Sequence, residues 1–89
     1  MILKKDWVLQ IDPRIFRELR KFPGKDQGRI LSIIEKLPSD PFYGDIQKMK
    51  KEINVWRRRF GSYRIFYELI LGSKVIYVFH AERRTSKTY

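Results

Sequence analysis

The stretch VWRRRFGSYRIFYELILGSKVIYVF, residues 55–79, decides the fold because its apolar residues follow the two-residue period of β-structure. It contains three runs rich in β-branched and aromatic residues, namely 55–60, 63–71 and 74–79. Gly61-Ser62 and Gly72-Ser73 separate these runs, and both pairs are compatible with tight hairpin turns. The middle run is apolar at most positions of both faces, which is typical of a central strand. The stretch therefore predicts a three-stranded antiparallel β-meander.

The residues before the meander predict one strand and two helices. Residues 7–11 form a short apolar run, and Asp12-Pro13 then supplies a helix cap and a favourable first helical residue. Two apolar helical stripes follow, one at Ile15, Phe16, Leu19 and Phe22 and one at Ile30, Leu31, Ile34 and Leu37. Prolines end the predicted helix after each stripe. We expect one α+β domain, residues 1–89, with an N-terminal strand, a two-helix antiparallel hairpin and the three-stranded meander.

The composition is that of a folded protein with one modest core. Hydrophobic residues make up 43% of the 89 residues and aromatic residues 15%. The absence of cysteine excludes disulfides, thiolate metal sites and cysteine nucleophiles, and fits a reducing cytoplasm. The single histidine, His80, cannot supply a ligand cluster, so we expect no metal site and no cofactor. Because the N-terminus has no apolar stretch suited to a signal peptide or membrane span, we expect a soluble cytoplasmic protein.

The positive charge is concentrated in the second half of the chain. The net charge is +10, of which residues 1–47 carry +2 and residues 48–89 carry +8. A concentrated positive field raises the rate of encounter with phosphates and releases counterions on binding. A basic surface kept only for solubility would be spread more evenly. The asymmetry therefore favours a polyanionic partner.

The arginines of the meander are the candidate anion-binding residues. Alternation along the first run places Arg57 and Arg59 on one face, about 7 Å apart, and Trp56, Arg58 and Phe60 on the other. Two such arginines alone are usually solvated surface residues. Arg64 opens the next strand, however, and Arg83 and Arg84 follow the last one, so we expect several guanidinium groups to converge. Without matching carboxylates they would repel one another, which favours an anionic ligand.

Other catalytic templates do not fit the chain. One histidine excludes most Ser-His-Asp arrangements, and no glycine spacing resembles a phosphate-binding loop. Glu52, Glu68 and Glu82 are isolated and suit surface or ion-pair roles better than a glycosidase pair. His80, at the end of a strand, suits a structural role better than a catalytic one.

The sequences WRRRFGSYRIFYEL and KVIYVFHAERRTSKTY resemble the RelE/ParE superfamily of toxins from toxin–antitoxin pairs. The resemblance covers essentially the whole chain, and its most specific parts are residues 61–68 and the Arg-Arg-x-x-x-x-Tyr close. It implies the fold expected above. RelE-type members cleave messenger RNA on the ribosome, whereas ParE-type members inhibit DNA gyrase and generally lack the full basic catalytic set.

The resemblance also implies a set of site residues. The basic and aromatic positions of RelE-like enzymes match Arg57, Arg59, Arg64, Arg83 and Tyr89, which favours a metal-independent endoribonuclease over a gyrase inhibitor. Such an enzyme uses the RNA 2′-hydroxyl as the nucleophile. Further contacts with nucleic acid are expected from five other basic residues of this half, Lys48, Lys50, Lys51, Arg84 and Lys87. The expected partners are messenger RNA, the ribosome and an acidic, helical antitoxin, which would join an otherwise monomeric toxin in a hetero-oligomer.

Two positions depart from the family pattern. Where some members have a lysine as the general base, this chain has Arg59, and a guanidinium is a very poor base. His80, Glu82, Tyr89 with a lowered pKa, or electrostatic stabilisation alone are the alternatives. Arg58 stands where the family is usually apolar, and either a place at the end of the sheet or a contact with the antitoxin would explain it. A plain RNA-binding module is the third functional alternative.

Overall fold

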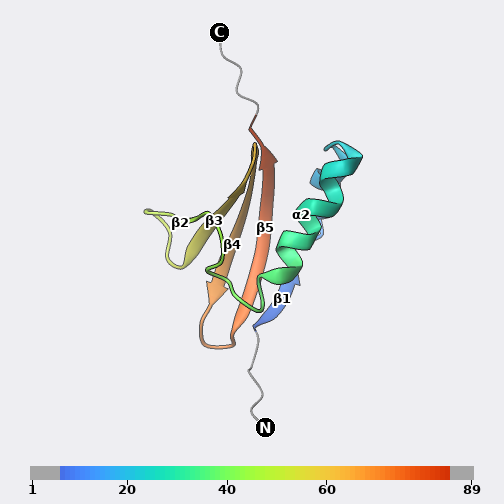
Figure 1. The fold of residues 1–89 in the computed structure, drawn as a ribbon. Coiled ribbons are helices and arrows are strands. Elements are labelled where there is room, and N and C mark those ends of the chain that lie inside the picture. Colours follow the sequence, from blue (N-terminus) through green and yellow to red (C-terminus); the bar gives the residue numbers. More distant parts are fainter. Residues whose placement is uncertain (1–6, 85–89) are drawn as a thin grey trace.

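The computed structural model describes residues 7–84, in which two helices pack on one face of a five-stranded sheet (Figure 1). The elements in chain order are β1 (Val8–Ile11), α1 (Arg14–Arg20), α2 (Gly24–Lys36), β2 (Ile46–Lys48), β3 (Val55–Phe60), β4 (Tyr63–Ile70) and β5 (Val75–Arg83). The strands lie side by side in the order β1-β5-β4-β3-β2. Strand β1 is parallel to β5, and all other neighbours are antiparallel. The predicted α+β fold and its meander, β3 to β5, are thereby confirmed.

The hydrophobic core lies between the helices and the central strands. Strand β4 points Tyr63, Ile65, Tyr67 and Leu69 towards the helices, and each is at least 95% buried. These side chains meet Ile15 and Leu19 of α1 and the buried face of α2. The prediction was wrong for Phe16, which is 42% exposed, because the face of α1 that meets the sheet is narrower than its apolar stripe. The opposite face of β4 carries Arg64, Phe66 and Glu68 and is therefore the face available for function.

Asp12 fixes the start of α1 and attaches it to the sheet. Its carboxylate accepts a hydrogen bond from the backbone N–H of Arg14 at 2.9 Å, as the predicted helix cap requires. It also accepts hydrogen bonds from the guanidinium of Arg14, at 2.9 Å, and from the hydroxyl of Tyr77 on β5. These hydrogen bonds, with that of the Arg14 side chain as the largest cause, hold the pKa of Asp12 well below its usual range.

The sheet is larger than the sequence indicated. Strand β2 lies within the segment 42–51, for which the sequence predicted no strand, and it pairs with β3 at the edge of the sheet. Its three residues, Ile-Gln-Lys, are too few and too polar to show a two-residue pattern. Strand β5 continues to Arg83, so His80 lies inside the strand and not at its end. Glutamate, histidine and arginine have no strong strand preference, and the sequence therefore did not predict residues 80–83 as part of the strand.

Arg58 explains how the segment before β2 is held. Arg58 is 9% exposed, its side chain lies on the helix side of β3, and its guanidinium donates to the backbone carbonyl of Tyr43 at 2.6 Å. It also lies 5.0 Å from the centre of the Tyr43 ring. Gly44 follows with φ of +90°, a conformation that glycine adopts without strain. Arg58 thus fixes the loop that leads to Asp45 and β2.

Candidate active site

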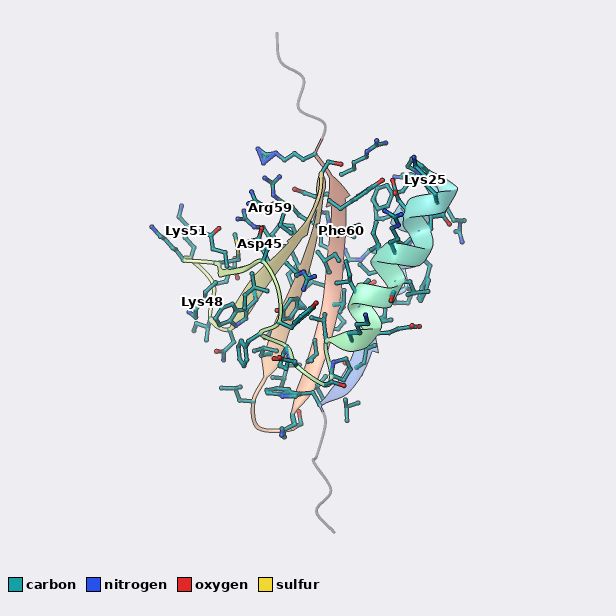
Figure 2. All side chains as sticks on the ribbon, in the orientation of Figure 1. Lys25, Asp45, Lys48, Lys51, Arg59 and Phe60 are labelled. Carbon is teal, nitrogen blue, oxygen red and sulfur yellow. The ribbon has the colours of Figure 1, made fainter. Side chains whose placement is uncertain are left out.

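The sheet face opposite the helices presents charged side chains in two rows across three strands. In the first row Arg59 of β3 is opposite Arg64 of β4, and Arg64 is opposite Glu82 of β5. In the second row, Arg57 is opposite Phe66, and Phe66 is opposite His80. Figure 2 shows Arg59 on the side of the sheet away from α2. Residues opposite one another in a sheet share a face, so the predicted convergence of Arg57, Arg59 and Arg64 is present. We call this surface the open face.

A cavity at one end of the first row is lined by cations and turn residues. Its volume is about 390 Å³, and its lining residues are Arg59, Gly61, Ser62, Arg64 and Arg84. The backbone N–H of Arg84 donates to the carbonyl of Ser62 at 2.6 Å, so the end of the described chain is fixed against the β3–β4 turn. Three guanidinium groups therefore border a space large enough for a phosphate and its adjoining ribose. We call it the arginine cavity.

Arg64 is the most confined of these cations. Its side chain is only 16% exposed, and its Nε and Nη1 atoms are buried without a hydrogen-bond partner among residues 7–84. The closest carboxylate oxygen, on Glu82, is 4.0 Å from Nη1, at the limit of an ion pair. Burial, followed by the positive charges of Arg84 and Arg57, lowers the pKa of Arg64. An anion in the cavity would both satisfy these donors and reduce the repulsion.

Arg59 already has an intramolecular partner. Its Nε donates to Asp45 at 2.9 Å, and the two side chains are 51% and 60% exposed, respectively. Figure 2 shows the two residues next to each other at the edge of the sheet. The expectation that the arginines have no matching carboxylates is therefore wrong for Arg59, because the unpredicted strand β2 brings Asp45 beside β3. Asp45 is the site residue that the sequence pattern did not identify as such.

Arg83 does not join the arginine cavity. Its guanidinium lies 5.6 Å from the centre of the Tyr63 ring, and that ring contacts Phe22 on the helix side of the sheet. The β4–β5 pairing contains an irregularity at which Phe66 is opposite His80 but Tyr67 is opposite Val78. One extra residue in β5 reverses which side chains reach each face. The expected convergence was thus wrong for Arg83, and Arg84 occupies the open face instead.

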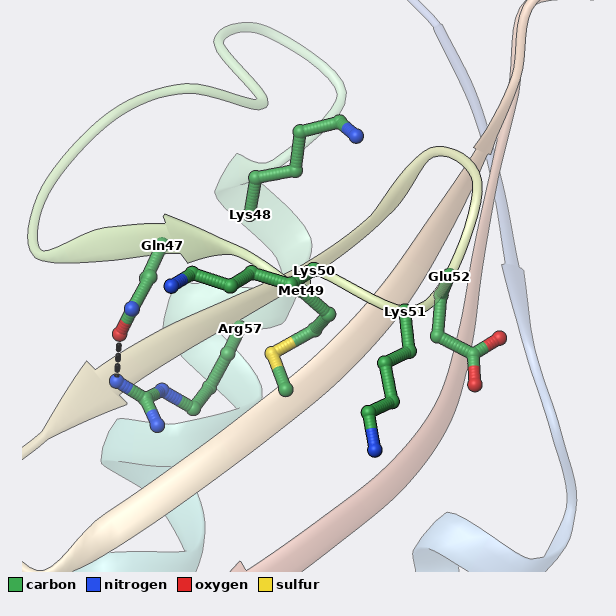
Figure 3. A pocket seen from close by; sticks show the side chains of 7 residues that line it. All are labelled: Gln47, Lys48, Met49, Lys50, Lys51, Glu52 and Arg57. Atoms are coloured by element: carbon green, nitrogen blue, oxygen red, sulfur yellow. Dashed lines mark hydrogen bonds between the residues drawn. The ribbon is translucent and has the colours of Figure 1, made fainter.

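The lysines at the end of β2 and in the β2–β3 connection lie beside the arginine cavity and not within its lining. Lys48, Lys50 and Lys51 line a second cavity, of about 430 Å³, together with Gln47, Met49, Glu52 and Arg57. In Figure 3 the side chains of Lys48 and Lys51 point in different directions, while Arg57 donates to Gln47. Arg57 therefore connects this basic segment to the open face. Lys87 and Tyr89 lie outside the described residues.

His80 and Glu82 interact on the open face. The imidazole Nε2 is 3.0 Å from a carboxylate oxygen of Glu82, and the ring centre is 5.4 Å from that of Phe66. The other carboxylate oxygen of Glu82 is the one that faces Arg64. Glu82 is thus an ion-pair residue, as expected, and it connects the only histidine of the chain to the most confined arginine.

Comparisons with known proteins agree with this architecture. No family model matches the sequence. The chain is 25% identical over 79 residues to "Putative toxin RelE1" of Methanocaldococcus jannaschii, covering 85% of this chain and 88% of the relative. The toxin of the RelB-RelE antitoxin-toxin complex from Methanococcus jannaschii is 26% identical, with a TM-score of 0.70 over 83% of this chain and 88% of the solved one.

A third similarity supports the fold alone. In the archaeal RelE-RelB complex from Pyrococcus horikoshii OT3, the matching chain has a TM-score of 0.77 at 22% identity, over 92% of this chain and 99% of that one. The chain thus aligns along most of its length with proteins named as RelE. It is therefore similar to RelE toxins of the RelE/ParE superfamily in sequence and in fold.

Proposed function

We propose that this protein is the toxin of a toxin–antitoxin pair and that it cleaves messenger RNA on the ribosome. The observation that carries the proposal is the arginine cavity, where Arg64 has buried donors and repelling neighbours. Such an arrangement destabilises the free protein and is stabilised by a bound anion. Relatives in solved complexes are RelE proteins bound to RelB antitoxins, which supports the toxin–antitoxin part.

The chemistry of RNA suits these residues. When the 2′-hydroxyl attacks the adjacent phosphorus, a doubly negative phosphorane forms, and the products are a 2′,3′-cyclic phosphate and a free 5′-hydroxyl. Guanidinium groups hold such phosphate oxygens in bidentate fashion, and Arg64 and Arg84 both line the cavity where these oxygens would lie. Because the arginines supply the positive charge, the proposed reaction needs no metal ion. Arg57 and the lysines of the β2–β3 connection would contact the flanking RNA backbone.

The antitoxin would compete for the same charges. We infer an acidic, helical segment as the partner, because a chain with a net charge of +10 associates fastest with a complementary surface. Covering the arginine cavity would exclude RNA. The free toxin would then be a monomer and the inactive form a hetero-oligomer.

Cleavage of ribosome-bound message tests this function. Incubation with translating ribosomes should give cuts within the occupied codon, and a 2′-deoxynucleotide at the cut site should abolish them. Arg64→Ala and Arg84→Ala should each lower the cleavage rate by about 10²–10³-fold, the typical loss for one charge-stabilising donor. Arg83→Ala should be less harmful than Arg84→Ala, and the exposed Arg17→Ala on α1 controls for the loss of a positive charge.

A gyrase inhibitor would give a different result. Under that alternative, ribosome-bound message stays intact, DNA supercoiling by gyrase is blocked, and Arg64→Ala keeps its toxicity. Cuts that persist with the 2′-deoxynucleotide would contradict the proposed mechanism even if cleavage occurs. Loss of cleavage in Arg17→Ala would show that overall charge, and not the cavity, is responsible.

A further inference from the structure

Among the described residues, those that line the arginine cavity include no group suited to accept a proton. Attack by a 2′-hydroxyl requires removal of its proton, and a guanidinium is a very poor base. Arg57, Arg59, Arg64 and Arg84 are therefore suited to charge stabilisation only. We therefore consider the other described side chains of the open face as proton acceptors.

His80 has the position and the hydrogen bonding of a general base. The bulge in β5 places it on the open face, in the row that contains Phe66 and Arg57. Its side chain is 47% exposed, so the ring is accessible to a substrate. Histidine is the side chain whose ordinary pKa lies nearest neutrality, which suits proton transfer at physiological pH.

Glu82 determines which ring nitrogen is basic. A carboxylate only accepts hydrogen bonds, so the 3.0 Å contact requires the proton of a neutral imidazole to be on Nε2. The lone pair is then on Nδ1. The second oxygen of Glu82 faces Arg64 at 4.0 Å, so the carboxylate is oriented by the cation that would bind the phosphate.

We propose that His80 is the general base of the RNA cleavage reaction and that Glu82 is its positioning residue. This inference rests on the proposed function. His80 Nδ1 takes the proton of the 2′-hydroxyl, the 2′-oxygen forms a bond to phosphorus, and the bond from phosphorus to the 5′-oxygen breaks. The 5′-oxygen keeps the electron pair of that bond and takes a proton from water, and the imidazolium returns its proton to the hydroxide produced.

The charged groups around the imidazole come from three strands. They are Glu82 on β5, Arg64 and Glu68 on β4, and Arg57 on β3. Only Glu82 is hydrogen-bonded to the ring among the described residues. Glu68→Gln therefore makes a matched control for Glu82→Gln, because it removes the same charge from the same face without touching the imidazole hydrogen bond.

Single-turnover cleavage of ribosome-bound message tests the proposal with five variants of the full chain. His80→Gln should lower the cleavage rate by about 10²–10⁴-fold, the range typical of a lost general base, with unchanged affinity for RNA. The acidic limb of the wild-type pH–rate profile should disappear in this variant. Added imidazole should restore cleavage by His80→Gly. Glu82→Gln should be slow and have an altered pH profile, Glu82→Asp should recover part of the rate, and Glu68→Gln should behave as wild type.

The outcomes separate the two proposals. If the wild type leaves ribosome-bound message intact, the proposed function itself fails. If the wild type cleaves and His80→Gln cleaves equally fast with the same pH profile, only the role of His80 is overturned. Because both side chains are partly exposed, thermal unfolding should show intact folding of each variant. If His80→Gln is slow because it is unfolded, the rate of Glu82→Gln and the pH–rate profile of the wild type decide the question. A wild-type cleavage rate that does not depend on pH would overturn the proposal.

Discussion

The Asp45–Arg59 ion pair predicts that removing one carboxylate strengthens RNA binding. Asp45 holds the guanidinium that the arginine cavity would use for a phosphate. Asp45→Asn keeps the shape of the side chain and removes its charge. The backbone hydrogen bond from Arg59 N–H to the Asp45 carbonyl, 2.8 Å long, keeps the loop in place. Arg59 would then be free to contact RNA.

The size of the gain follows from the exposure of the pair. Both side chains are at least half exposed, and such surface pairs contribute about 0.2–1 kcal/mol. Releasing Arg59 from this competition should therefore tighten the binding of RNA by about 1.5- to 5-fold. One additional phosphate contact on a single strand should also steepen the slope of log K against log salt by about 0.7.

Fluorescence anisotropy with a short single-stranded RNA, made uncleavable by 2′-deoxy substitution, would measure both quantities. Glu35→Gln is the matched control, since it makes the same change of charge at an exposed position of α2 on the other side of the sheet. It should leave the salt slope unchanged. In an Arg59→Met background, Asp45→Asn should have no more effect than Glu35→Gln.

Two results would refute this reasoning. If Asp45→Asn and Glu35→Gln change the affinity and the slope equally, only net charge matters and Arg59 does not contact RNA. If Asp45→Asn weakens binding, the ion pair positions Arg59 for the ligand and does not compete with it.

Two further predictions concern stability. Burial raises the pKa of Tyr67 from its ordinary 10.0 to about 12. Because the protonated phenol is favoured in the folded state, this stabilisation is full below pH 10 and is lost as the pH rises towards 12, by about 2–3 kcal/mol in total. Urea unfolding between pH 9 and 12 should show that loss of stability, and the loss should be smaller in Tyr67→Phe. If the pH dependence of the free energy of unfolding is the same in Tyr67→Phe, Tyr67 is not its source. Gly44→Ala should cost about 1–3 kcal/mol, since a Cβ there would lie 1.9 Å from the fixed guanidinium of Arg58 at a φ of +90°. Gly28→Ala in α2 should instead increase the free energy of unfolding, because the space there is open and alanine favours the helix. Chemical denaturation would measure both variants, and equal changes in the free energy of unfolding would contradict the geometry.

Local sequence patterns were sufficient to predict the meander and the two helices. Val55–Phe60 was predicted with its observed bounds, because the two-residue period begins at Val55 and the Gly61-Ser62 turn ends the run. The alternation also placed Arg57, Arg59 and Arg64 on one face, as the pairing of β3 with β4 confirms. The catalytic roles proposed for them stay predictions, as does that of Tyr89, which lies outside the described residues.

Pairing between segments far apart in the chain determined the positions of β1 and β2, which the local sequence pattern did not predict. Strand β2 has three residues and exists because β3 offers it a partner, and this pairing brings Asp45 to Arg59. Strand β1 joins the sheet through parallel pairing with β5 across more than 60 residues of chain, which no nearby residues signal. Such contacts depend on the folded neighbours and not on propensity.

The sequence alone determined that a basic, antiparallel sheet would carry a cluster of arginines, because charge and alternation are properties of adjacent residues. Only the tertiary structure decided which residues after Val78 reach the open face. Strict alternation from the buried Val78 would send Arg83 to that face and His80 to the core. The extra residue at the Phe66–Tyr67 irregularity reverses this order, burying Ala81 and presenting His80, Glu82 and Arg84. A bulge arises from how two strands pair, and a one-residue shift of register exchanges every side chain beyond it between the faces.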